Sequence, residues 1–292
     1  MVIGIFGPTA SGKSRVSESV AERTPAELVS ADAMQVYRGL PILTNQTAAQ
    51  LVAIWPLDHE ASVGEYAPLA HVAIDRALAS GLTPIVVGGT GLYFRAALGE
   101  LELPPPPAAG RRERWARLYD EDRDEAVRVL RERDPRAEAI HPNDRKRVIR
   151  ALELAEMGET LRPDEPELWA RRHRHPTVVV GLEVPKEVLE RRIVERTREM
   201  FERGVQDEVR TALAGPISTT ARKTLGLEEI ATLPPYEAER AVVIRTRRYA
   251  SYQRKWMRRI PDIVIVAGDR PPGEVADDIV ELARARQHLS RR

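Results

Sequence analysis

VIGIFGPTASGKS, residues 2–14, is the stretch that decides the fold of this chain. Its first half is an apolar run typical of a buried strand, and its second half fits the pattern G-x-x-x-x-G-K-[ST]. In such a loop the backbone N–H groups converge on a phosphate, Lys13 adds a positive charge, and the Ser14 hydroxyl can hold magnesium. Val16 and Val20 follow at helical spacing, which puts the anion at a helix N-terminus. The stretch predicts a strand, a phosphate loop and a helix that bind a di- or triphosphate, against the alternative of a chance match in a surface turn.

The composition excludes several kinds of chemical site and limits the partners that the chain can bind. The 292 residues include 45 basic and 44 acidic side chains, a formal net charge of +1, so only local basic clusters could bind a nucleic acid. The absence of cysteine excludes disulfides, thiolate zinc sites and a cysteine nucleophile. No basic leader precedes the first strand, and no apolar stretch approaches the roughly 18 residues that span a bilayer. We therefore expect a soluble, cytoplasmic monomer with no membrane partner.

Two more polar positions follow apolar strands. Asp32 comes after the run at 27–31, and Thr90 lies in the turn GGTGLY, residues 88–93, after the run at 83–87. The carboxyl ends of parallel strands share one crevice, so both side chains should face the same space as Lys13. A purely structural role is open for each: Asp32 could cap a helix or close an Asx-turn, and Thr90 could cap the next helix.

Four prolines at 104–107 mark an internal boundary, because they fit neither a helix interior nor a central strand. Residues 111–165 then show a charged, helical pattern, which Asp134-Pro135 interrupts; Asn143 or Asp144 should cap its last helix.

The core pattern resumes at a strand over 177–182 and continues with helices over 186–202 and 236–259, a strand over 263–266 and a helix from about 273. We predict an α/β protein with a phosphate-loop NTPase-like core, residues 1–110 and 166–292. Its mostly parallel sheet should be flanked by helices, and residues 111–165 should form a small all-helical insertion.

Two segments carry basic faces. Lys146 and Arg150 are spaced i, i+4 on the side away from Val148, and the segment 245–259 has no acidic residue. Within that segment Arg247, Arg254 and Arg258 lie opposite the apolar stripe of Val242, Tyr249 and Trp256. Such faces can bind a polyanion, although a solvated charged face is the more frequent meaning of such a run.

Taken in order, the motifs resemble the tRNA dimethylallyltransferase family. They are GPTASGKS at 7–14, SADAMQVYRG at 30–39, GGTGLY at 88–93, NDRKRVIRALE at 143–153, and TRRYA at 246–250 followed by Gln253 and Trp256. The resemblance covers most of the chain. It implies a fold related to small-molecule kinases, which binds dimethylallyl diphosphate and transfers the prenyl group to the exocyclic amine of the adenine 3′-adjacent to a tRNA anticodon.

The resemblance also implies roles for particular residues. Asp32 would be the general base, Thr90 and Lys13 would complete the catalytic set, and Ser14 would hold magnesium. The residues it assigns to the diphosphate are Gly7, Thr9, Ala10, Ser11, Gly12, Lys13, Ser14, Arg222 and Lys223. The residues it assigns to the tRNA anticodon stem-loop are Asp32, Ala33, Met34, Gln35, Arg112, Lys146, Arg147, Val148, Ile149, Arg150, Arg247 and Arg254.

The chain departs from the family pattern in four places. Residues 43–47 read LTNQT where G-T-A-K-P is usual, and residues 55–59 read WPLDH where P-H-H-L is expected. Leu227 stands where a tyrosine is usual, and Ser251-Tyr252 interrupts what is normally a basic pair. Three other functions fit parts of the sequence: a small-molecule kinase that uses the loop with ATP, a non-catalytic RNA-binding or nucleotide-sensing module, and a relative that prenylates free adenosine phosphates.

Overall fold

The structure is a computed structural model, and it describes residues 1–101, 110–161 and 172–289. The chain divides into two compact units, one of residues 1–100 with 171–292 and one of residues 101–170. The four prolines at 104–107 and the predicted boundary at 165/166 lie outside the described residues. The assignment of 111–165 as the insertion therefore stays a prediction.

The first unit is built on a sheet whose strands are all parallel, in the order β2-β3-β1-β4-β5. The strands are β1 (Val2–Phe6), β2 (Ala26–Ser30), β3 (Thr83–Gly88), β4 (Thr177–Glu183) and β5 (Val264–Ala267). The central strand β1 is buried throughout, with Ile5 opposite Val87 of β3 and Val180 of β4. The order reverses beside β1, and in open α/β sheets ligands bind in the crevice at such a point.

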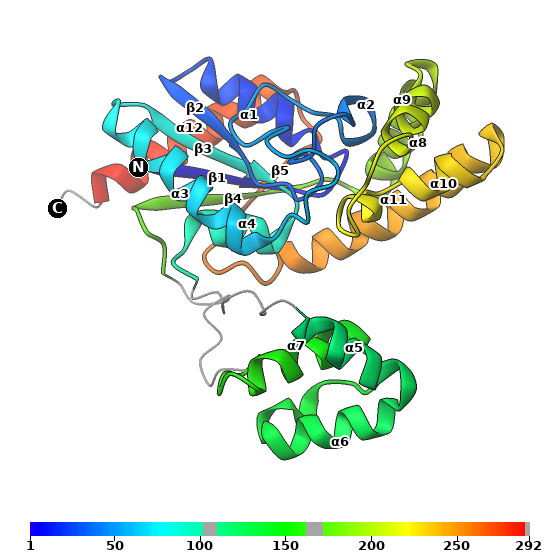
Figure 1. Cartoon of the computed structure of the whole chain (residues 1–292). Helices are drawn as coiled ribbons and strands as arrows, with labels where there is room; N and C mark the ends of the chain where they lie inside the picture. The colour runs from blue at the N-terminus through cyan, green and yellow to red at the C-terminus, as the bar shows by residue number, and fades with distance from the viewer. Residues whose placement is uncertain (102–109, 162–171, 290–292) are drawn as a thin grey trace. The chain divides into compact units, whose positions relative to one another are not determined.

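Helices cover both faces of this sheet, and Figure 1 shows the two layers. One layer is α1 (Lys13–Ala21) and α12 (Pro272–Leu289), and the other is α3 (Val63–Ala79) and α4 (Gly91–Leu98). Val20 and Ile279 pack with Ile5 on the first face, and Ile74 and Phe94 pack with Phe6 on the second. The predicted α/β class, with a parallel sheet flanked by helices, is confirmed.

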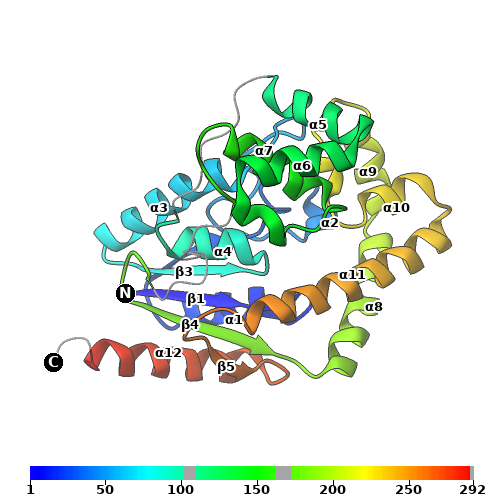
Figure 2. The same cartoon turned by 90° about the horizontal axis from the view of Figure 1, so that it is seen from below.

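The remaining helices of this unit gather at the carboxyl ends of the strands, where Figures 1 and 2 both show α8 and α11 side by side. They are α2 (Pro41–Thr44), α8 (Lys186–Glu202), α9 (Val205–Leu213), the 3₁₀ turn η3 (Ala221–Lys223), α10 (Leu227–Thr232) and α11 (Pro235–Met257). Val242 and Met257 of α11 are buried and Tyr249 and Trp256 are half-buried, so the predicted stripe faces the protein.

The second unit contains α5 (Arg111–Glu121), α6 (Arg123–Arg133), the 3₁₀ turn η1 (Pro135–Ala139) and α7 (Arg145–Ala155). Its core is formed by Trp115, Leu130, Val148 and Leu152 among others. Asp144 is the N-cap of α7 and accepts a hydrogen bond from the Arg147 N–H, which decides between the two predicted caps. This part of the chain is all-helical in its described residues, as predicted.

Candidate active site

The phosphate loop joins β1 to α1 at the centre of the crevice. The Gly7 N–H donates to the Gly88 carbonyl oxygen at 3.3 Å, so the loop is tied to the glycine-rich turn after β3. Gly12 has φ 89° and is the N-cap of α1, a left-handed conformation that glycine adopts without steric cost. The loop thereby leads its amides into the first turn of a helix, where an anion is favoured.

Several predicted site residues line a single pocket at this loop. Thr9, Lys13 and Ser14 come from the loop and α1, while Asp32, Met34 and Gln35 come from the segment after β2. The other lining residues are Leu43, Thr44, Asn45, Thr47, Val87, Gly88, Arg196, Leu225, Tyr249 and Gln253. The predicted meeting of the strand ends in one crevice is thus observed for Lys13 and Asp32.

Asp32 both closes an Asx-turn and lines the pocket. Its Oδ1 accepts a hydrogen bond from the Met34 N–H at 2.9 Å, which closes an Asx-turn. The same carboxylate lines the pocket with Lys13, and Oδ2 is not used by the turn. The turn therefore fixes the orientation of the carboxylate without taking it out of the pocket.

Thr90 occupies the N-cap position of α4, but its side chain makes no capping hydrogen bond. Instead its Oγ1 accepts from the Ala33 N–H at 3.2 Å and lies 3.5 Å from the Tyr249 hydroxyl. The capping alternative for this hydroxyl is therefore wrong. The contact with Ala33 brings Thr90 beside Asp32, because Ala33 and Asp32 are adjacent in the chain.

The electrostatics of the pocket centre on Lys13. Burial lowers the pKa of its ammonium to about 8; Asp32 works against this shift, and Arg196 adds to it. Burial likewise lowers the pKa of the Arg196 guanidinium and raises that of the Tyr249 phenol, which the Asp32 charge raises further. Two crowded, poorly solvated cations in one pocket favour an anionic ligand.

The comparisons with known proteins agree with this geometry. The family described as IPP transferase matches residues 35–260. The chain belongs to the IPP transferase family. It is 36% identical to the tRNA dimethylallyltransferase of Streptomyces griseus, over 94% of this chain and 93% of the relative, and 37% identical to that of Streptomyces coelicolor, over 91% and 90%.

Solved structures show the same fold. The full-length tRNA isopentenylpyrophosphate transferase of Bacillus halodurans superposes with a TM-score of 0.72 at 28% identity, covering 100% of this chain and 99% of that one. A eukaryotic dimethylallyltransferase acting on tRNA gives a TM-score of 0.80 at 24% identity, covering 100% of this chain and 80% of that one. In the described part of this chain, no helix is both long and apolar enough to cross a membrane.

Two residues that the sequence analysis does not assign to the site, Arg196 and Gln253, contact Thr9. Arg196 Nη1 donates to the Thr9 hydroxyl at 3.1 Å, and the Thr9 N–H donates to Gln253 Oε1 at 2.8 Å. The spacing of Arg192 and Arg196, i, i+4 on the helix after β4, was a signal available in the sequence, since that strand also ends at the crevice. Gln253 gave no signal of its own beyond its place in the family motif.

Gln35 and the pair Arg222 and Lys223 are placed differently from their predicted roles. The Gln35 amide accepts from the Ser30 hydroxyl and donates to the carbonyl oxygens of Thr44 and Asn45, so it holds the segment 43–47 in place. The residue also lines the pocket, and its contact with tRNA stays a prediction. Arg222 and Lys223 are exposed on η3 and do not line the pocket, which Leu225 reaches instead. Their contact with the diphosphate stays a prediction.

The predicted tRNA residues of α7 fall into two groups. Val148 and Ile149 are buried in the core of the helical unit, so direct contacts from their side chains do not fit the structure. Lys146 and Arg147 are exposed on the same helix. The buried pair therefore supports the helix that presents the exposed pair.

A buried carboxylate organises the other two predicted cations of this unit. Glu153 is 0% exposed, and it accepts hydrogen bonds from Arg112 Nε at 2.7 Å and from Arg150 Nη1 at 3.0 Å. Arg112 and Arg150 are thus held by an internal ion pair. On α11 of the other unit, Arg247 is exposed, and Arg254 is half-buried with Nη2 3.7 Å from a Glu183 carboxylate oxygen.

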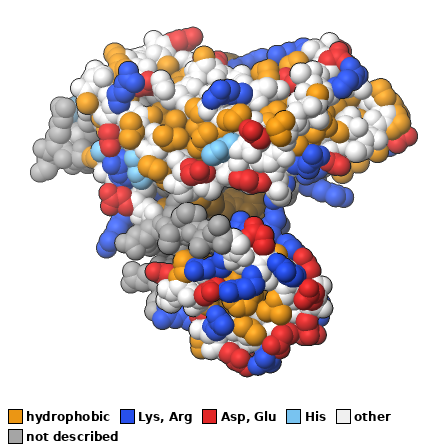
Figure 3. All heavy atoms as spheres, viewed as in Figure 1, with side chains coloured by type: hydrophobic (Ala, Val, Ile, Leu, Met, Phe, Trp, Pro, Cys, Tyr) orange, Lys and Arg blue, Asp and Glu red, His pale blue; other side chains and the backbone are white. Residues whose placement is uncertain are grey.

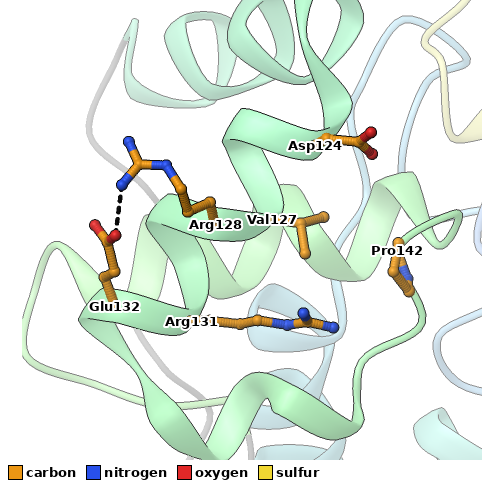
Figure 4. A pocket seen from close by; sticks show the side chains of 6 residues that line it. All are labelled: Asp124, Val127, Arg128, Arg131, Glu132 and Pro142. Carbon is orange, nitrogen blue, oxygen red and sulfur yellow. Dashed lines mark hydrogen bonds and ion pairs between the residues drawn. The ribbon is translucent and has the colours of Figure 1, made fainter.

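The surface of the helical unit carries both signs of charge. Figure 3 shows acidic and basic side chains interspersed on the face it presents. The unit has a hollow of about 450 Å³. Figure 4 shows the side chains that line it, with Arg128 paired with Glu132. Its lining residues are Asp124, Val127, Arg128, Arg131, Glu132 and Pro142, none of which belongs to the predicted site.

Ser14 was predicted to hold magnesium, and the donors around it fit such a role. Within residues 1–101, 110–161 and 172–289, no three His, Cys, Asp or Glu side chains are grouped to hold a metal ion. Magnesium bound with a phosphate substrate commonly needs only one or two protein ligands, because phosphate oxygens and waters supply the rest. The Ser14 hydroxyl lines the pocket together with Asp32 and Lys13, which meets that requirement.

Proposed function

We propose that this chain transfers a dimethylallyl group from dimethylallyl diphosphate to the exocyclic amine of the adenine 3′-adjacent to the anticodon in tRNA. The observation that carries the proposal is the pocket in which the phosphate-loop Lys13 faces Asp32, with Thr90 beside Asp32, in a chain of the IPP transferase family. The names of the relatives support both substrates: the proteins of Streptomyces griseus and Streptomyces coelicolor, each named tRNA dimethylallyltransferase, align with more than nine-tenths of this chain.

The cationic end of the pocket would hold the diphosphate. Lys13 and Arg196 supply positive charge, and the amides at the start of α1 face the same space. When the allylic C–O bond breaks, the electron pair leaves with the diphosphate, and preorganised cations stabilise the charge that accumulates there. Magnesium on Ser14 would add to this stabilisation. Arg222 and Lys223 belong to the proposal only if the segment around η3 moves toward the pocket.

The Asp32 end of the pocket would receive the adenine. The exocyclic amine is a poor nucleophile, so a carboxylate that accepts its proton as the new C–N bond forms should help by about 10²- to 10⁴-fold. Asp32 Oδ2 is the oxygen left for that proton, because Oδ1 is held by the Met34 N–H. The Thr90 hydroxyl, which accepts from the Ala33 N–H next to Asp32, would orient the amine. The adenine must leave its stack to enter the pocket, which a mobile anticodon loop permits at low cost.

The exposed cations of α7 and α11 would bind the tRNA backbone. Lys146 and Arg147 on one unit, and Arg247 on the other, are outside the internal pairing that holds Arg112 and Arg150. The helical insertion would thus be a tRNA-contacting element of the enzyme. A place in the cytoplasm accompanies the proposal, because tRNA is the substrate, and the monomeric state stays a prediction.

The test is to incubate the protein with bulk tRNA and labelled dimethylallyl diphosphate, digest the tRNA, and analyse the nucleosides. The proposal expects label on one modified adenosine. Label on free adenosine phosphates but not on tRNA would favour the related small-molecule prenyltransferases, and transfer of phosphate from ATP with no prenylation would favour a kinase. None of the relatives reported above is named as a kinase.

A further inference from the structure

Gln253 of α11 joins the two glycine-rich loops of the pocket. It is 2% exposed, and its side-chain amide is used on both sides: Oε1 accepts from the Thr9 N–H at 2.8 Å, and Nε2 donates to the Gly89 carbonyl oxygen at 3.0 Å. Thr9 belongs to the phosphate loop and Gly89 to the turn that carries Thr90. One side chain thus connects the loop proposed for the diphosphate to the turn proposed for the adenine.

The surrounding backbone is shaped for this contact. A Cβ atom on Gly89 would lie 2.3 Å from Gln253 Nε2 and 2.8 Å from the Gly7 carbonyl oxygen, so only glycine lets the two loops approach each other and the amide at once. Thr90 follows Gly89 in the same turn, and its Oγ1 lies 3.5 Å from the Tyr249 hydroxyl oxygen. Tyr249 precedes Gln253 by one helical turn of α11. Consecutive turns of α11 therefore contact the site, although this helix lies about 150 residues or more from both loops in sequence.

The contact with Gln253 also uses one backbone N–H of the phosphate loop, that of Thr9. The Thr9 N–H points to Gln253, and its hydroxyl accepts from Arg196, so both polar groups of Thr9 are bonded to protein. Thr9 is therefore anchored to α8 and α11, and it lines the pocket together with Lys13 and Ser14.

We propose that Gln253 is a positioning residue for prenyl transfer, which sets the separation between the phosphate loop and the turn of Thr90. This inference rests on the proposed function, since it assumes that the two loops hold the two reactants. A prenyl diphosphate held by Lys13 and an amine held at Asp32 and Thr90 react only if the allylic carbon and the nitrogen are within near-attack distance. A misplacement of about 1 Å can cost about 10²-fold in rate.

The test compares Gln253→Leu, which keeps the approximate volume and removes both hydrogen bonds, with Gln253→Glu, which keeps only the acceptor for Thr9. The matched control is Thr246→Val, which alters another buried polar residue of the same helix, about two helical turns before Gln253. Single-turnover prenyl transfer, the KM for dimethylallyl diphosphate, the affinity for inorganic pyrophosphate and the melting temperature are measured for each.

We expect kcat to fall by about 10- to 100-fold in both Gln253 variants. The KM and the pyrophosphate affinity of Gln253→Leu should stay within about threefold of the wild type, because Lys13, Ser14 and Arg196 are unchanged and no charge is added. The carboxylate of Gln253→Glu would lie beside the phosphate loop and repel the anion, so this variant is judged by kcat at saturating substrate. A kcat of Gln253→Leu equal to that of Thr246→Val, or a loss of its pyrophosphate affinity as large as its loss of kcat/KM, would overturn the proposal, because Gln253 would then support only the phosphate loop. If Gln253→Leu does not fold, Gln253→Met, which also lacks both hydrogen bonds and adds no charge, decides by the same criteria. Failure of the proposed function would appear differently, as absent prenylation by the wild type.

Discussion

Arg196 donates from Nη1 to the Thr9 hydroxyl over 3.1 Å, which brings a guanidinium of α8 to the phosphate loop of β1 and α1. The guanidinium lines the same pocket as Lys13, and burial lowers its pKa. The pocket thus holds two cations from segments far apart in the chain, and a diphosphate is the ligand that both can meet.

Arg196→Ala should weaken the binding of dimethylallyl diphosphate, because it removes a charge-assisted hydrogen-bond donor to the leaving group. The loss should be about 10- to 100-fold in KM or in the affinity for the diphosphate alone. The matched control is Arg198→Ala on the same helix, an exposed residue whose Nε is 3.4 Å from Glu202. Equal affinities for the two variants would remove Arg196 from the diphosphate site.

The affinity for dimethylallyl diphosphate should depend on pH through Lys13, whose pKa burial lowers to about 8. A bound anion raises that pKa again, because it favours the charged form. Below pH 8 the ammonium is already protonated and the affinity should be flat. Above pH 8 binding must take up a proton, so the affinity should fall by up to about tenfold per pH unit.

Calorimetry in two buffers of different ionisation enthalpy measures that proton uptake directly, in the absence of tRNA. Lys13→Arg, whose charge does not titrate in this range, should show no uptake if it binds. A wild-type affinity that is constant from about pH 7 to about pH 9.5 would contradict a titrating Lys13.

Asp32→Asn should distinguish the structural role of Asp32 in the Asx-turn from its proposed role as the general base. Asparagine keeps an oxygen that can accept from the Met34 N–H, so the Asx-turn and the melting temperature should persist. It cannot accept the proton of the amine, so single-turnover prenyl transfer should fall by at least about 10²-fold. Normal transfer by this variant would leave Asp32 with a structural role only.

Charge reversal should test the two basic faces. Arg147→Glu and Arg247→Glu alter exposed side chains, so each should fold and weaken tRNA binding. The magnitude of the salt slope should fall by about one for each tRNA phosphate that the variant no longer neutralises. Arg131→Glu, an exposed reversal on α6, is the control for net charge. If all three variants bind tRNA equally, with unchanged salt dependence, the faces on α7 and α11 are merely solvated.

Reversal of Arg150 should have a different effect, because this residue is paired with the buried Glu153. Placing a second carboxylate there would remove one of the two cations that neutralise Glu153 and would add a like charge beside it, with Arg112 as the remaining partner. We expect Arg150→Glu to destabilise the helical unit by about 3 kcal/mol or more, whereas Lys146→Glu on the exposed face should change stability by less than about 0.5 kcal/mol. Chemical denaturation of variants that keep Trp115 as their only tryptophan, followed by fluorescence, measures both, and equal midpoints would contradict the internal role of Arg150.

The sequence by itself determined the elements of this protein whose geometry depends on residues close together in the chain. The apolar run, glycines, lysine and serine of 2–14 specify a strand, loop and helix because their geometry depends only on local backbone preferences and hydrogen bonds. The period at 186–202 predicts the helix that the structure has at Lys186–Glu202. The rule that parallel strands end at one edge predicts that Asp32 lies near Lys13, and both line one pocket.

Only the tertiary structure decided which side chains complete the pocket and which are used internally. Gln253 meets Thr9 and Gly89 across 244 and 164 residues, and no periodic pattern in the chain records such a contact. In the same way, Gln35 and Arg150 look like surface contacts in the sequence but have their partners inside the protein, at Ser30 and Glu153. A hydrogen bond depends on where distant segments are brought by packing, so the residue type and its local spacing do not reveal whether its partner is a ligand or the protein itself.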